Sequence, residues 1–80
     1  MVLDVSIVSP IKVIFEGNAR SIILPGEQGV FEILPFHKPV LSRLITGTIV
    51  VDEHPFPIHR GAVKFYQNKV TVVVEEALER

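Results

Sequence analysis

Residues 62–74 read AVKFYQNKVTVVV, and this stretch decides the fold class. Two runs rich in β-branched and aromatic residues, 62–66 and 70–74, are separated only by Gln67, Asn68 and Lys69. Runs of this composition on either side of so short a polar segment predict a β-hairpin with a short loop. Residues 62–74 are therefore expected to be β-structure.

Further strand signals precede this hairpin. Leu3, Val5 and Ile7 alternate with Asp4 and Ser6, which is the period-two pattern of a half-buried strand. Other short apolar runs lie between turn signals, and they predict strands over 11–16, 19–24, 30–33, 48–53 and 56–60. Short strands at this spacing are typical of a β-sandwich or a β-barrel. The sequence thus predicts an all-β fold.

Glycine and proline mark the predicted turns. We expect turns at Ser9-Pro10, Gly17-Asn18, Pro25-Gly26 and His54-Pro55. Residues 35–39 are expected to form a loop, because a proline at each end fixes φ and removes an N–H donor. Pro57 favours an edge position for the 56–60 strand. The pattern of residues 40–45 fits either a strand or a helical turn.

The length of 80 residues permits one domain, with expected boundaries 1–74 and a short charged tail over 75–80. The tail has helix-forming composition but is too short to be stable alone. A chain of this size buries only about 60–65% of its unfolded surface. Because 48% of the residues are hydrophobic and the mean hydropathy is +0.40, some apolar surface is expected to face another protein.

Several classes of protein are disfavoured by composition. No apolar run approaches the ~18 residues of a transmembrane helix, and the first residues lack the features of a signal peptide, so a cytoplasmic location is the default expectation. The absence of cysteine excludes disulfides and thiolate chemistry. The net charge is −1, and the eight Lys and Arg residues are spread along the chain, which argues against nucleic-acid binding.

The polar residues do not form a recognisable catalytic or metal-binding motif. The histidines His37, His54 and His59 lack the i, i+4 spacing of a helical zinc motif. Adjacent Asp52 and Glu53 would point to opposite faces of a strand. The serines lie in strand or turn contexts with no Gly-x-Ser-x-Gly elbow: Ser6, Ser9, Ser21 and Ser42. We therefore expect no active site, no metal and no cofactor.

Two shorter segments leave alternatives open. The segment PGEQG over 25–29 lacks the Gly-Lys-Ser/Thr ending of a phosphate-binding loop, so it is either an ordinary turn or a partner-contact loop. Lys69 lies at the tip of the predicted hairpin, where biotin and lipoate carrier domains place their modified lysine. Its neighbours Asn68 and Val70 do not match the motifs of those carriers.

Taken together, several segments follow one known pattern. They are the segment VSP over 8–10, VIFEG over 13–17, ILPGEQGVFEILPFHKPVL over 23–41, Leu44 with Gly47, and GAVKFYQNKVTV over 61–72. In order and spacing they resemble the N-terminal β-sandwich domain of the ε subunits of F-type ATP synthases. The resemblance covers nearly the whole chain and implies a flattened sandwich of about ten short strands.

The resemblance also implies a function and partners. Domains of this family belong to the rotor, where they bind the γ subunit and the c-ring, associate with the membrane only through the complex, and carry no catalytic residues. A peripheral position on the cytoplasmic face of the inner (plasma) membrane is implied. The segment matching the c-ring-facing loop comprises Glu27, Gln28, Gly29, Val30 and Phe31. The γ-facing side matches Ser9, Pro10, Phe36, His37 and Lys38.

This sequence departs from the family pattern at three positions. Phe36 and Glu32 stand where glycine is common, and Arg60 replaces the first glycine of a pair expected at a turn. Phe31 and Phe36 are each expected either at an interface or in the core. The chain also stops at Arg80, where family members continue into C-terminal helices. A short form without those helices is expected neither to inhibit ATP hydrolysis through them nor to bind ATP there.

Two functional alternatives come from other classes. An oligonucleotide-binding barrel for single-stranded nucleic acid would need stacking aromatics in a basic groove, which the charge balance opposes. A carrier domain or enzyme fragment would need a modified Lys69.

Overall fold

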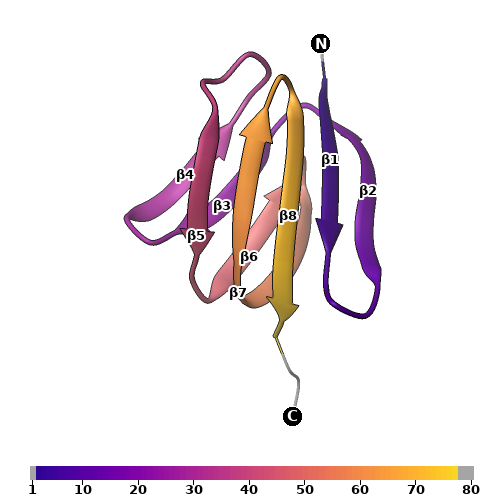
Figure 1. The fold of residues 1–80 in the computed structure, drawn as a ribbon, viewed down its shortest axis with the longest axis vertical. Coiled ribbons are helices and arrows are strands. Elements are labelled where there is room, and N and C mark those ends of the chain that lie inside the picture. The colour runs from indigo at the N-terminus through magenta and orange to yellow at the C-terminus, as the bar shows by residue number, and fades with distance from the viewer. Residues whose placement is uncertain (1, 78–80) are drawn as a thin grey trace.

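The computed structural model describes residues 2–77 and contains eight β-strands (Figure 1). In chain order they are β1 (Leu3–Val8), β2 (Val13–Ala19), β3 (Ile22–Gly26), β4 (Gly29–Ile33), β5 (Val40–Leu44), β6 (Gly47–Val51), β7 (His54–Tyr66) and β8 (Lys69–Glu76). The prediction of an all-β single domain is confirmed, with eight strands where about ten were expected. No helix in this part of the chain is long and apolar enough to cross a membrane.

The strands form two layers that share β7 (Figure 1). One layer has the order β2-β1-β8-β7-β5, and the other contains β4, β3 and β6. The first part of β7 pairs with β6, which in turn pairs with β3, whereas its second part lies between β5 and β8. β1 and β8 run parallel, from the Asp4–Lys69 pair to the Val8–Val73 pair. This arrangement is the β-sandwich that the family resemblance implied.

The core lies between the two layers and is built from alternate strand residues. Leu3, Val5 and Ile7 are fully buried, as their spacing predicted. Val5 pairs with Val70 and Ile7 pairs with Val72, so the apolar faces of β1 and β8 continue into one another. The other buried hydrophobic residues are Ala19, Ile22, Leu24, Ile33, Leu44, Ile49, Val51, Ile58, Val63, Phe65, Val70, Val72 and Val74.

β7 is a single strand of 13 residues that contains a β-bulge. The register with β8 shifts between Ile58 and Arg60, so His59 is the extra residue. A bulge bends its strand and changes which residues face inward. The buried positions accordingly change from Ile58 to Val63 and Phe65. The prediction of separate strands over 56–60 and 62–66 was therefore wrong. The bulge shifts the alternation of buried and exposed residues, and in the sequence this shift resembles the end of one strand and the start of another.

The turn predicted at Gly17-Asn18 is not present. Both residues lie inside β2, where Gly17 pairs with Val5 and Asn18 pairs with Asp4 of β1. The ladder with β1 holds this segment in an extended conformation, and tertiary pairing overrides the local preference of these residues for turns.

The turn predicted at His54-Pro55 lies two residues earlier. Asp52 and Glu53 connect β6 to β7, and Val51 pairs with His54 across the turn. Asp52 adopts a φ of 55°, which aspartate tolerates better than most residues. Its Oδ1 accepts hydrogen bonds from the backbone N–H groups of Arg20 (2.9 Å) and Ser21 (3.2 Å). These contacts fix the turn at Asp52.

Strand pairing decides between the alternatives that the sequence left for other segments. Residues 40–44 form β5, so the strand alternative holds there. Pro57 of β7 pairs with Thr48 of β6. Among the described strands, β6 is the only one that pairs with this part of β7. Arg60 lies inside β7 opposite Glu75, which corrects the expectation of a turn at that position.

β8 ends within the segment that was predicted as a tail. Glu75 and Glu76 belong to β8, and Glu75 forms an ion pair with Arg60 at 3.4 Å. Residues 78–80 of that segment lie outside the described residues.

Candidate partner-binding site

The hairpin between β3 and β4 presents residues 27–31 at one side of the sandwich. Gly26 pairs with Gly29, and Glu27 and Gln28 form an exposed two-residue turn between them. Gly29 has a φ of 125°, a conformation that side chains with a Cβ rarely adopt. A Cβ on Gly26 would lie 2.7 Å from the Phe31 ring. The two glycines thus shape the turn and let the ring pack onto the backbone.

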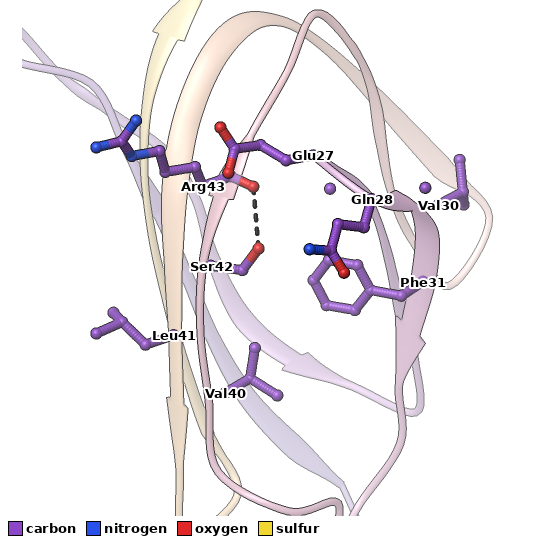
Figure 2. A pocket seen from close by; sticks show the side chains of 10 residues that line it. Glu27, Gln28, Val30, Phe31, Val40, Leu41, Ser42 and Arg43 are labelled. Atoms are coloured by element: carbon purple, nitrogen blue, oxygen red, sulfur yellow. Dashed lines mark hydrogen bonds between the residues drawn. The ribbon is translucent and has the colours of Figure 1, made fainter.

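A groove of about 600 Å³ lies between this hairpin and β5 (Figure 2). Only the ends of the two elements are joined, through the Gly26–Leu44 pair and the hydrogen bond from the Ile45 N–H to the Pro25 carbonyl (2.8 Å). Apart from that junction, the described residues of the hairpin do not pair with β5. All five residues predicted to contact the c-ring line the groove: Glu27, Gln28, Gly29, Val30 and Phe31.

The groove has a distinct inner and outer side. Figure 2 shows the Gln28 side chain and the Phe31 ring pointing inward, toward Val40 and Ser42 of β5. Val30 points away from the groove and is 74% exposed. Phe31 is half-buried and packs against the core, so its side chain is neither fully buried nor fully exposed.

The loop over residues 34–39 connects β4 to β5 and carries three of the predicted contact residues. Phe36 is 72% exposed, so the core alternative is excluded for this residue. Its φ of 69° lies in the left-handed region, which would suit the glycine that the family resemblance implies at this position. The Phe36 N–H donates a hydrogen bond to Asn68 Oδ1 at 2.8 Å.

His37 and Lys38 follow in the same loop. The His37 N–H donates to the Leu34 carbonyl at 3.1 Å, and the imidazole stands edge-on to Phe65 with ring centroids 6.1 Å apart. Its Nδ1 lies 2.7 Å from the Lys38 carbonyl oxygen. His37 is therefore anchored to the core while remaining exposed, and Lys38 is exposed beside it.

Ser9 and Pro10 lie far from this loop. They form the β1–β2 connection, at the lower end of the view in Figure 1, whereas the β4–β5 loop lies at the upper end. The Ser9 N–H donates to the Lys12 carbonyl (2.8 Å), and Ser9 Oγ accepts from the Lys12 N–H (3.3 Å). The structure thus brings Phe36, His37 and Lys38 together and places Ser9 and Pro10 at the opposite end.

Two exposed apolar residues next to these segments were missed by sequence reasoning. Ile11 is 86% exposed beside Pro10, and Leu41 is 83% exposed on the outer face of β5. The position of Ile11 directly after a predicted turn could have indicated that its side chain is exposed. Leu41 gave none, because the pattern of residues 40–45 did not separate an inner from an outer face.

The described residues contain no cluster of three His, Cys, Asp or Glu side chains arranged to hold a metal ion. Lys69 begins β8 and lies 3.6 Å from Asp4 Oδ2 in an exposed ion pair. The features of the site are accordingly those of a binding surface: an open groove, exposed apolar side chains and charged residues at its rim.

Comparisons with known proteins identify the fold and the family. Residues 2–80 match the family model described as the ATP synthase delta/epsilon chain β-sandwich domain. The chain is 36% identical over 81 residues to the ATP synthase epsilon chain of Sulfurovum sp., and 36% identical over 81 residues to that of Nitratiruptor sp.. In both cases the match covers 95% of this chain and 63% of the relative, so the chain spans less than two thirds of their length.

Solved structures show the same fold at lower identity. A chain in the mitochondrial ATP synthase structure of Euglena gracilis has a TM-score of 0.87 and 15% identity, covering 96% of this chain and 52% of that chain. A chain in the central stalk/c-ring structure from Tetrahymena thermophila has a TM-score of 0.77 and 16% identity, covering 92% and 63%. Because the family model matches nearly every residue, the chain belongs to the family of ATP synthase delta/epsilon chain β-sandwich domains.

Proposed function

We propose that this domain is a non-catalytic rotor component of the central stalk of an F-type ATP synthase. In this role it joins the γ subunit to the c-ring and couples proton flow to ATP synthesis at catalytic sites in neighbouring subunits. The observation that carries the proposal is the match of residues 2–80 to the delta/epsilon β-sandwich family. The domain is held at the cytoplasmic face of the membrane through the complex alone, and nucleic acid is not a partner.

The c-ring contact is assigned to the β3–β4 hairpin and its groove. The proposed residues are Glu27, Gln28, Gly29, Val30 and Phe31. Glu27 and Gln28 supply exposed polar groups at the tip, and Val30 supplies an exposed apolar side chain next to them. Phe31 supports the hairpin from inside the groove. A mixed surface of this kind suits the polar loops of a membrane rotor.

The γ contact is assigned to both ends of the large layer. The proposed residues are Ser9, Pro10, Phe36, His37 and Lys38. The β1 strand separates the two groups, and six strand residues at about 3.3 Å each extend roughly 20 Å. A single partner that contacts both groups must therefore be elongated along the strand direction. Aromatic side chains are enriched at interfaces, which favours exposed Phe36 as the main apolar contact.

Co-expression with the γ subunit of the same organism tests the proposal directly. We expect a stable complex that survives gel filtration at micromolar concentration. Absence of a complex under these conditions would contradict the rotor assignment.

Single substitutions test the assigned γ face. F36A and H37A are each expected to weaken γ binding by roughly 1–2 kcal/mol, or about 5- to 30-fold in Kd, measured by titration calorimetry. H54A is the matched control, because His54 is an exposed histidine at a different turn, beside the β6–β7 connection. Unchanged affinity for both loop variants would mean that γ binds another face.

A charge at the hairpin tests the c-ring contact. V30D is expected to weaken binding of the domain–γ complex to purified c-ring in lipid nanodiscs, because an exposed apolar contact is replaced by a charge. T48D on β6 is the control for adding a carboxylate at an exposed position. Equal binding by the two variants would show that Val30 is not part of the interface.

A further inference from the structure

The turn between β7 and β8 is formed by Gln67 and Asn68. Tyr66 pairs with Lys69 across it, and the two turn residues have φ values of 51° and 63°. A two-residue hairpin turn with both central residues at positive φ matches the twist of the adjoining strands, and asparagine is one of the residues that tolerates this conformation best. Asn68 is thus suited to its turn on backbone grounds alone.

Asn68 also connects two segments that are distant in the sequence. Its Oδ1 accepts a hydrogen bond from the Phe36 N–H at 2.8 Å, and its backbone carbonyl accepts one from the Asp4 N–H at 2.8 Å. Asn68 is half-buried, between the β4–β5 loop and the start of β1. The side-chain contact is not part of the β7–β8 ladder, and its one donor among the described residues is the Phe36 N–H.

Phe36 needs an external restraint to keep its conformation. A bulky side chain at a φ of 69° is disfavoured, and such conformations persist only where surrounding contacts determine them. The contacts on either side of Phe36 are the Asn68 hydrogen bond to its N–H and the His37 N–H bond to the Leu34 carbonyl. With the backbone held in this way, the Phe36 ring projects into solvent.

We propose that Asn68 is a positioning residue for partner binding: its amide oxygen holds the Phe36 backbone so that the aromatic ring is presented in advance to the γ subunit. The proposal rests on the proposed function, since it concerns the same γ contact. Pre-organisation lowers the conformational cost of association, because the ring does not have to be ordered when the partner binds. Asn68 itself does not have to touch γ.

Three variants separate the side-chain contact from the turn. N68G keeps the positive φ of the turn and removes the Oδ1 acceptor, whereas N68D keeps a carboxylate oxygen in its place. Q67G is the matched control, because Gln67 occupies the neighbouring turn position with a φ of 51°. Each is compared with the unsubstituted chain by amide hydrogen exchange and by titration with γ.

We expect N68G to speed exchange of the Phe36 amide about tenfold while the amides of Val63 and Val72, in β7 and β8, keep their protection. The affinity of N68G for γ should fall about three- to tenfold, with N68D and Q67G within about twofold of the unsubstituted chain. A purely structural role of the turn would instead make Q67G and N68G behave alike.

Two results would overturn the proposal. Unchanged exchange at Phe36 in N68G would show that Asn68 does not hold the loop. Faster exchange with unchanged γ affinity would show that it orders the loop without preparing it for binding. Failure of the unsubstituted chain to bind γ is a different result: it contradicts the proposed function, and the exchange data still decide whether Asn68 restrains Phe36.

Discussion

The β3–β4 hairpin and the β4–β5 loop both present residues to the proposed partners, but their shapes have different origins. The turn of the hairpin is determined locally, by Gly26 and Gly29 and by the pairing of β3 with β4 beside it. The loop depends on residues about thirty positions away, because Asn68 bonds the Phe36 N–H and Phe65 supports the His37 ring. One contact surface is therefore encoded in a short stretch of sequence, and the other exists only once the sandwich has formed.

This difference predicts where each segment is sensitive to substitution. Changes to the backbone glycines should disturb the hairpin, whereas changes at remote supports should disturb the loop. The exposed side chains at both tips should be replaceable with little effect on folding.

The largest effect is expected from G26A. The added Cβ would lie 2.7 and 2.9 Å from two Phe31 ring atoms and 3.0 Å from the Gly29 carbonyl oxygen. Overpacking of this kind costs about 1–3 kcal/mol in the free energy of unfolding, measured by urea denaturation. In an F31A background the same substitution should cost clearly less, since the ring that it strikes is gone. An equal cost in both backgrounds would show that the ring is not what Gly26 accommodates.

A somewhat smaller loss is expected from G29A. There is open space around a Cβ at this position, so the cost comes from the φ of 125° and not from a clash. We expect a destabilisation of about 1–2 kcal/mol by urea denaturation, with F31A giving no relief. Coupling between G29A and F31A would contradict this separation of steric and conformational effects.

In contrast to these glycine substitutions, F36G in the loop is expected to raise the free energy of unfolding. Glycine adopts a φ of 69° without strain, while the exposed Phe36 ring contributes little buried area. Relief of strain, reduced by the greater entropy of glycine in the unfolded chain, should raise the free energy of unfolding by about 0.5 kcal/mol. The same variant should lose γ affinity. A stabilised protein with full affinity would show that the ring serves neither the fold nor the contact.

The smallest effects on stability are expected from E27A and Q28A. Both residues are exposed at the hairpin tip, and surface substitutions away from caps and buried contacts stay within about 0.5 kcal/mol. Thermal unfolding midpoints should be close to that of the unsubstituted chain, and any defect should appear in c-ring binding. A large drop in the midpoint would mean that the tip is tied to the rest of the fold.

Much of the fold was predictable from alternation, and the failures have physical causes. Leu3, Val5 and Ile7 were correctly assigned to the buried face of one strand because that strand is regular. The bulge at His59 reversed the phase inside β7, so one strand resembled two. Gly17 and Asn18 were assigned to a turn because their local preference is real, but the β1 ladder outweighs it.

The arrangement of the proposed contact residues in space could be predicted only in part. The resemblance pointed to residues 27–31, and the structure gathers all five around one groove. It could not show that Ser9 and Pro10 lie at the opposite end of the sandwich from Phe36, because that depends on the direction in which β1 runs beside β8. Nor did it reveal the support from Asn68, which is a contact between segments that lie far apart in the sequence.

The parallel pairing of β1 with β8 has a consequence for the synthesis of this domain on the ribosome. Asp4 pairs with Asn18 of β2 early, but its β8 partner is available only when Lys69 has been made, so β1 emerges from the exit tunnel long before β8. Pairing between such distant segments slows folding and leaves unpaired strand edges exposed in the meantime. The β1–β2 hairpin must therefore remain a nascent, partly formed element until then, and the sandwich can close only after β8 has left the exit tunnel.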